Sequence, residues 1–151
     1  YLHGIELSTS YQFQPQWTAS GWFTWMEGEV DQYPTSTAAK QREPISRLMP
    51  VTGQFCLRWE HPSRKFWIEG VATVADRQDN LSTEDTRDTQ RIPPDGTPGY
   101  AVGTIRAGWN ITRDISLTAA VENLSDENYR IHGSGVNEPG RNVVATVRAR
   151  F

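Results

Sequence analysis

Residues 54–77 read QFCLRWEHPSRKFWIEGVATVADR, and this stretch decides the fold. On either side of the polar link 61–65, apolar and polar side chains alternate with a period of two, as Phe55, Leu57 and Trp59 do in the first half. Successive side chains of a β-strand point to opposite faces of its sheet. The alternation therefore predicts two strands, each with one apolar face, that are joined by a hairpin turn.

The same alternation recurs along the whole chain of 151 residues, and helical periodicity is nearly absent. The alternating segments are 5–13, 17–26, 54–60, 66–77, 101–109, 115–124 and 142–151. We therefore predict an all-β fold, an antiparallel up-and-down meander of about seven strands.

The links between these segments differ in length in a regular way. Short links at 14–16, 61–65 and 110–114 alternate with long links at 27–53, 78–100 and 125–141. In a meander this places every short turn at one end of the sheet and every long loop at the other. Outer-membrane barrels show the same asymmetry, so the pattern predicts that the sheet is part of a transmembrane β-barrel.

The aromatic residues provide an independent indication. Near the short-turn ends, aromatic side chains fall on the apolar parity of their strands: Tyr11, Phe13, Trp17, Trp59, Phe66, Trp109 and Phe151. Aromatic rings gather where a membrane meets water, because one edge of the ring is wet and the other is apolar. We predict that this row forms an aromatic girdle and that lipid of the outer membrane surrounds the apolar face.

The opposite parity carries ionisable residues in the middle of the strands, too many for a protein core. They are Arg58, Glu69, Arg106, Glu122 and Arg148. An Arg or Lys that faces lipid near the middle of a bilayer costs about 2–4 kcal/mol. We therefore predict that these five residues face the lumen of the barrel, without committing to particular ion pairs.

Alternation alone does not say which face lies inside, so a soluble lipocalin-like barrel or β-sandwich that binds a ligand remains an alternative. Other classes are excluded more firmly. The net charge of −3 argues against a nucleic-acid partner, and no stretch approaches the length of a membrane helix. The catalytic pattern G-x-S-x-G is absent, which favours a protein that is not an enzyme. The acidic stretch 76–95 lacks the spacing of a calcium loop, and the three histidines, expected to be exposed, lack zinc spacing, so we expect no metal and no cofactor.

Residues 122–142 read ENLSDENYRIHGSGVNEPGRN and are followed by one last alternating strand. This segment resembles the C-terminal end of the TonB-dependent outer-membrane receptors, in which N-L-x-D-x-x-Y leads through a Gly-rich loop and P-G-R to a terminal strand that ends on an aromatic residue. The matching positions are Asn123, Leu124, Asp126, Tyr129, Gly133, Gly135, Pro139, Gly140, Arg141 and Phe151.

The resemblance implies a 22-stranded barrel preceded by a plug domain and an energy-coupling box. Residues 1–151 are then expected to be the C-terminal segment of such a barrel, the last seven strands, with the plug and the earlier strands absent. The whole receptor would lie in the bacterial outer membrane and import a scarce ligand, such as a ferric siderophore, with force delivered by TonB through the absent N-terminal region. This segment would supply wall and extracellular loops.

Loop residues that would contact such a ligand are chosen for their chemistry. Anionic iron chelates are bound well by guanidinium groups and by aromatic rings. The candidates are Arg42, Arg47, Arg87, Arg91, Tyr129, His132 and Arg141.

Overall fold

The protein is described by a computed structural model that covers residues 1–33 and 35–151. Its strands are β1 (Leu2–Gln14), β2 (Trp17–Gln32), β3 (Gln41–Pro44), β4 (Thr52–Glu60), β5 (Phe66–Ala75), β6 (Tyr100–Asn110), β7 (Ile115–Glu122) and β8 (Asn142–Ala149). One short helix, α1 (Thr83–Arg87), lies between β5 and β6. No helix within the described part of the chain is long and apolar enough to cross a membrane.

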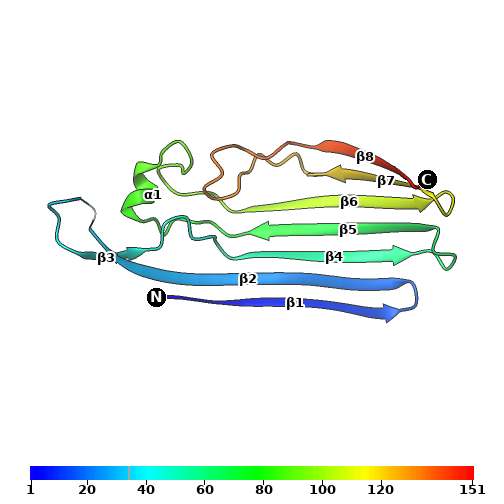
Figure 1. Cartoon of the computed structure of the whole chain (residues 1–151), viewed down its shortest axis with the longest axis horizontal. Helices are drawn as coiled ribbons and strands as arrows, with labels where there is room; N and C mark the ends of the chain where they lie inside the picture. The colour runs from blue at the N-terminus through cyan, green and yellow to red at the C-terminus, as the bar shows by residue number, and fades with distance from the viewer. Residues whose placement is uncertain (34) are drawn as a thin grey trace.

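The strands form a single antiparallel sheet in the order β1-β2-β4-β5-β6-β7-β8, with β3 paired to the far end of β2. Apart from β3, strands that follow one another in sequence are paired in the sheet, so the predicted meander is confirmed. Hairpin turns lie at one end of the sheet, and the long loops and α1 lie at the other (Figure 1). The predicted sorting of short and long links is confirmed as well.

The structure contains one strand more than the seven predicted. Strand β2 continues to Gln32, well beyond the predicted end at Met26, and the extension pairs with β3 from Glu29↔Pro44 to Gln32↔Gln41. Both elements fall inside the predicted loop 27–53, where alternation gave no signal. Pro34, in the same loop, lies outside the described residues.

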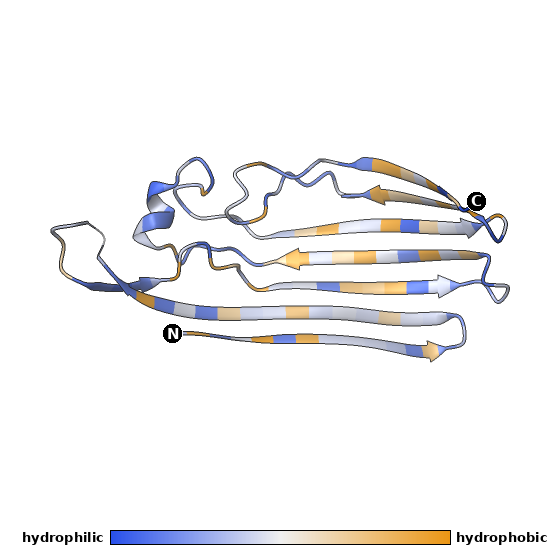
Figure 2. Cartoon of the chain, in the orientation of Figure 1, coloured by the Kyte–Doolittle hydropathy of each residue, from blue (hydrophilic) through white to orange (hydrophobic). Residues whose placement is uncertain are grey.

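The register fixes which residues share a face, because directly paired residues of an antiparallel sheet project to the same side. One row crosses the whole sheet as Tyr11, Ala19, Leu57, Gly70, Ile105, Val121 and Val143. The next row on the other face reads Gln12, Thr18, Arg58, Glu69, Arg106, Ala120 and Val144. One face of the sheet is thus apolar, and the other carries the charges. Hydrophobic and hydrophilic residues accordingly follow one another along the strands (Figure 2).

The apolar face is uncovered. Leu7, Phe55 and Val147 are 63%, 56% and 69% exposed, whereas the described residues include only three buried hydrophobic side chains, those of Val71, Ala75 and Ile92. A soluble sandwich or lipocalin-like barrel buries its apolar face as a core. No second layer covers this face within the described chain, and the sheet is a single layer (Figure 1).

Candidate functional site

The three long loops pack against one another at one end of the sheet. We call residues 41–51, 76–99 and 123–141 the loop assembly. The Gln78 side-chain amide donates to the carbonyl oxygen of Leu48 at 2.7 Å, which joins the first two loops. The Thr97 hydroxyl lies 2.9 Å from Nδ1 of His132, which joins the second and third loops. The assembly is therefore one connected unit and not three separate loops.

The carboxylate of Asp85 lies at the centre of the contact between the first two loops and is only 2% exposed. It accepts hydrogen bonds from the Ser46 hydroxyl at 2.8 Å and from the backbone N–H groups of Arg47 and Ser82, each at 3.0 Å. Burial raises the pKa of Asp85, but these hydrogen bonds outweigh burial and hold the pKa below its ordinary value. A buried charge that is satisfied in this way fixes the positions of its donors.

Local sequence explains how α1 presents these groups. Ser82 caps the helix: its hydroxyl accepts from the backbone N–H of Asp85 at 3.1 Å, and Asp85 accepts in return from the backbone N–H of Ser82, a capping box. A second nearly buried carboxylate, Glu43 of β3, accepts from the backbone N–H and hydroxyl of Thr83 at 2.7 and 2.6 Å and from the Gln32 amide at 2.8 Å. The short helix is thus held to β2 and β3 through polar contacts.

Two candidate ligand residues meet at Asp88, and we call Arg47 and Arg91 the arginine pair. Their guanidinium groups lie 2.8 and 3.0 Å from the Asp88 carboxylate. The hydrogen bond from Arg91, followed by that from Arg47, holds the pKa of Asp88 below its ordinary value. Gly133 and Gly135, at φ of 77° and 78°, bring the third loop against the pair, so that a Cβ would lie 3.6 Å from Cδ of Arg47 and 3.1 Å from Cγ of Arg91. All three loops meet here.

The motif that carried the family resemblance folds the third loop. Asn123 is 3% exposed, at φ of 51°, and its amide donates to the carbonyl oxygens of Glu127 and Pro139 at 2.8 and 3.1 Å. Its side-chain oxygen accepts from the backbone N–H of Glu127 at 2.9 Å. Asp126 accepts from the backbone N–H of Arg141 at 2.7 Å. The motif therefore ties the start of the loop to its end.

The expectation that the histidines are exposed is wrong for His132, which is 6% exposed. Its Nδ1 contacts Thr97, and its Nε2 has no hydrogen-bond partner among the residues described. Burial lowers the pKa of His132, and the negative charge of Asp85 opposes this shift. The Tyr129 ring lies on the Tyr100 ring, with 4.3 Å between their centroids, and burial raises the pKa of Tyr129.

The remaining candidates are placed apart from the arginine pair. Arg42 lies in β3 and bonds Asp31 of β2 at 3.3 Å. Arg87 lies in α1 and interacts electrostatically with Glu43. Arg141 lies at the base of the third loop. The structure thus brings together only some of the seven candidates, and most of them hold the loops in place.

The five residues predicted to share a face do so. Arg58, Glu69 and Arg106 are directly paired across β4, β5 and β6. Glu122 has the parity of Ala120, which pairs with Arg106, and Arg148 pairs with Ser116 on the same face.

The ion pairs on this face centre on Glu69, which is 14% exposed and lies 3.8 Å from Arg58 and 3.5 Å from Arg106. The Arg58 guanidinium also lies over the Trp67 ring, 4.1 Å from its centroid. A Cβ at position 108 would collide with that ring, so glycine is needed there. Arg106 therefore pairs with the neighbouring strand β5 and not with Glu122 of β7 in the described structure.

Sequence reasoning missed Glu43 and Asp85, the two carboxylates that hold the loop assembly together. Asp85 was visible only as part of the acidic stretch 76–95, although Ser82-x-x-Asp85 matches the capping-box pattern S/T-x-x-D/E. Their partners lie about 40 positions away, at Thr83 and Ser46. No group of three or more His, Cys, Asp or Glu side chains that could hold a metal ion occurs in residues 1–33 and 35–151.

Known proteins share this combination of a sheet with one apolar face and long loops gathered at one end of the sheet. A family model described as "TonB dependent receptor-like, beta-barrel" matches residues 1–124. The chain belongs to this family. The family resemblance noted at residues 122–142 is thereby confirmed by a model that matches most of the chain. A search of curated proteins finds no significant sequence match.

Solved structures of this family share the fold. The copper transporter OprC matches with a TM-score of 0.78 and 19% identity over 99% of this chain and 23% of that one. A mutant ferric enterobactin receptor from Pseudomonas aeruginosa, in complex with enterobactin, matches with a TM-score of 0.67 and 18% sequence identity. The match covers 99% of this chain and 22% of that receptor chain. The ferric-catecholate import receptor Fiu from E. coli K12 matches with a TM-score of 0.63 and 18% sequence identity, over 99% of this chain and 21% of that chain. The chain thus spans less than a quarter of the length of these receptors.

Proposed function

We propose that residues 1–151 form the C-terminal wall strands and extracellular loops of a TonB-dependent outer-membrane transporter that imports a scarce ligand such as a ferric siderophore. In this function the chain binds and admits cargo and carries out no reaction on it. Membership of the TonB-dependent receptor-like barrel family supports the proposal. The observation that carries it is the apolar face of the sheet, which no other part of the described chain covers.

The exposed face requires an apolar environment. Its large side chains include Leu7 at 63%, Tyr11 at 68% and Phe55 at 56% exposure, spread over several strands. Soluble proteins rarely expose contiguous apolar patches of more than a few hundred Å². Lipid satisfies this face, and the paired backbone groups of the sheet need no water there. The soluble alternative has no such partner for the face and is not favoured.

The charged face is assigned to the lumen of the barrel. Residues on that parity of β5, such as Val71 and Ala75, are buried, whereas Ile68 and Val74 of the other parity are more than 40% exposed. Side chains converge on the inner face of a curved sheet and diverge on its outer face. Greater crowding on the charged parity therefore supports an inward orientation for Glu69 and its two arginines, where water and the plug domain of the receptor satisfy them.

The loop assembly is assigned to the outer surface of the cell, where it would meet the ligand first. The arginine pair is the best candidate for ligand contact among the seven residues, because the two cations lie together and both side chains remain about half exposed. One carboxylate, Asp88, faces these two cations, so a positive charge is left for an anionic chelate. Tyr129, His132 and Arg141 are assigned to positioning the third loop.

The test is uptake by cells that depend on the receptor. Cells lacking the gene are complemented with the wild-type receptor, with Arg47→Gln/Arg91→Gln, or with the matched control Lys40→Gln/Arg77→Gln, and uptake of radioactive ferric enterobactin and other ferric siderophores is measured at limiting concentration. We expect at least a tenfold loss of the transported chelate for the arginine-pair variant and little loss for the control. Equal uptake by both variants, with equal amounts in the outer membrane, would contradict the assignment.

A further inference from the structure

Cations near the two ends of the sheet differ in whether a carboxylate lies close enough to form an ion pair. Several cations of the loop end and of the middle of the sheet have a carboxylate within 4 Å in the described structure. These cations are Lys40, Arg42, Arg47, Arg58, Arg77, Arg91 and Arg106. At the short-turn end, the cations have no such carboxylate among the residues described.

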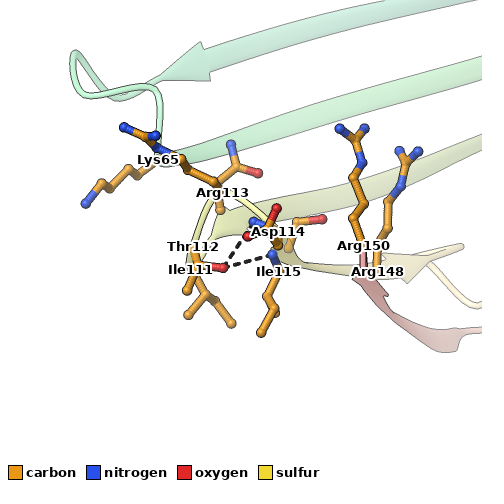
Figure 3. A pocket seen from close by; sticks show the side chains of 10 residues that line it. Lys65, Ile111, Thr112, Arg113, Asp114, Ile115, Arg148 and Arg150 are labelled. Carbon is orange, nitrogen blue, oxygen red and sulfur yellow. Dashed lines mark hydrogen bonds between the residues drawn. The ribbon is translucent and has the colours of Figure 1, made fainter.

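Four of these cations line a hollow, which we call the basic hollow. It has a volume of about 770 Å³ and lies between Lys65 at the β4–β5 turn, the β6–β7 turn and the end of β8. Lys65, Arg113, Arg148 and Arg150 line it, against one carboxylate, that of Asp114 (Figure 3). With four cations and one anion among its lining side chains, the hollow carries an uncompensated positive charge, which favours an anionic ligand.

The walls of the hollow are held in place by the backbone. The Thr112 hydroxyl accepts from the backbone N–H groups of Asp114 and Ile115 at 3.2 and 3.0 Å, which shapes the turn. The backbone N–H of Arg150 donates to the carbonyl oxygen of Asp114 at 2.9 Å, which fixes the end of β8 against this turn. The cations are thus presented by ordered elements.

The orientation of Arg148 and Arg150 helps to decide which kind of anionic ligand the hollow could bind. Arg148 and Arg150 point to one side of the sheet and Ile115 to the other (Figure 3). Arg148 shares the face of Arg58 and Arg106, opposite the exposed apolar side chains. Being two positions apart on one strand, Arg148 and Arg150 repeat at roughly 7 Å, the spacing of alternate residues in an extended peptide.

We propose that the basic hollow binds an extended acidic peptide segment whose carboxylates alternate along the chain. Each carboxylate meets a guanidinium or ammonium group, and Arg148 and Arg150 take two carboxylates in register. The choice of a peptide over a lipid headgroup rests on the proposed function, which turns this face away from lipid. The hollow is then a docking site at the periplasmic mouth of the barrel.

The test uses the full chain folded in detergent micelles and a fluorescent peptide of alternating glutamate and serine, eight residues long. Binding is measured by fluorescence anisotropy at low salt. The variant Arg148→Gln/Arg150→Gln is compared with Lys40→Gln/Arg77→Gln, which removes the same charge from exposed side chains at the other end. We expect at least a tenfold loss of affinity for the first variant, less than a threefold loss for the control, and no binding of a lysine–serine peptide.

Equal losses in the two variants would overturn the proposal, because they would show attraction to net charge alone. Absence of binding by a protein whose circular dichroism shows intact strands would also overturn it. Competition for the fluorescent peptide is measured with phosphatidylglycerol vesicles, inorganic phosphate and unlabelled peptide. If vesicles or phosphate displace the fluorescent peptide at a lower concentration than unlabelled peptide does, the hollow is a site for phosphate groups and the proposal is overturned. If the protein binds the peptide but does not partition with outer membranes, the peptide site in the basic hollow is supported and the proposed function is contradicted.

Discussion

The loop assembly and the sheet are stabilised in opposite ways. The assembly contains buried polar groups that are hydrogen-bonded, such as Asp85 and Asn123. The sheet has its backbone paired from β1 to β8 but leaves its apolar side chains exposed on one face. Stability of the loops therefore comes from within the chain, whereas stability of the wall depends on what surrounds it. Substitutions in the two regions are expected to respond to different conditions.

The largest expected effect is on the wall. Ile105, in the middle of β6, is 45% exposed on the apolar face. Ile105→Arg is expected to destabilise the protein in lipid vesicles by about 2–4 kcal/mol, measured by urea unfolding, because the cation faces hydrocarbon. Thr104→Arg, one position away on the charged face, is the control and is expected to cost less than about 1 kcal/mol. Equal costs would contradict the assignment of the faces.

The next effect is on the loop assembly. Asp85→Ala leaves the Ser46 hydroxyl and the backbone N–H groups of Arg47 and Ser82 without their acceptor. We expect the free energy of local opening to fall by about 2–3 kcal/mol, seen as faster hydrogen exchange in residues 41–51 and 76–99. Asp79→Ala, which removes an exposed partner of Arg77, should change exchange little. Unchanged protection in Asp85→Ala would refute the central place of this carboxylate.

A smaller effect is expected in the third loop. Asn123→Ala removes the hydrogen bonds to Glu127 and Pro139 and places alanine at a positive φ. Protection of residues 123–141 should fall by about 1–2 kcal/mol. Asn128→Ala, which removes one exposed bond to Asn137, is the matched control. If both variants behave alike, the motif does not act as a clamp.

The smallest effect is a pH dependence. The pKa of His132 is lowered in the folded loop, so the folded protein resists a proton that the opened loop accepts. Loop stability should therefore fall as the pH drops below the ordinary histidine value of 6.5, by at most about 1.4 kcal/mol per pH unit. Hydrogen exchange of residues 123–141 between pH 7.5 and 5.5 measures it. His132→Gln should abolish the slope and His61→Gln should keep it; a slope that survives His132→Gln would contradict this explanation.

The strands of the sheet could be predicted from sequence because apolar and polar side chains alternate along them with a period of two. A sheet with one apolar face and one polar face produces alternation in the sequence, which can be recognised without any knowledge of the fold. The extension of β2 to Gln32 and the strand β3 could not be predicted, because their pairing depends on backbone hydrogen bonds and on polar side-chain contacts such as Arg42 with Asp31, which leave no apolar period in the sequence. Their side chains are polar on both faces, so no alternation marks them.

The loop assembly could not be predicted for a different reason. Its contacts join residues far apart in sequence, such as Glu43 with Thr83 and Thr97 with His132. A buried aspartate and a solvated one look the same in a sequence until their donors are known. Composition therefore indicated seven ligand candidates, of which His132 and Arg141 turn out to contact other loop residues and Tyr129 the first residue of β6.

The central claim is that the apolar face of the sheet meets lipid and the charged face does not. A nitroxide placed in turn at positions 104, 105, 106 and 107, in a protein with Cys56→Ser, measures this directly in lipid vesicles by collision with oxygen and with a water-soluble nickel complex. Oxygen should dominate at Ile105 and Ala107, and the nickel complex at Thr104 and Arg106, with a period of two. The reverse pattern, or the same accessibility at all four positions, would contradict the account.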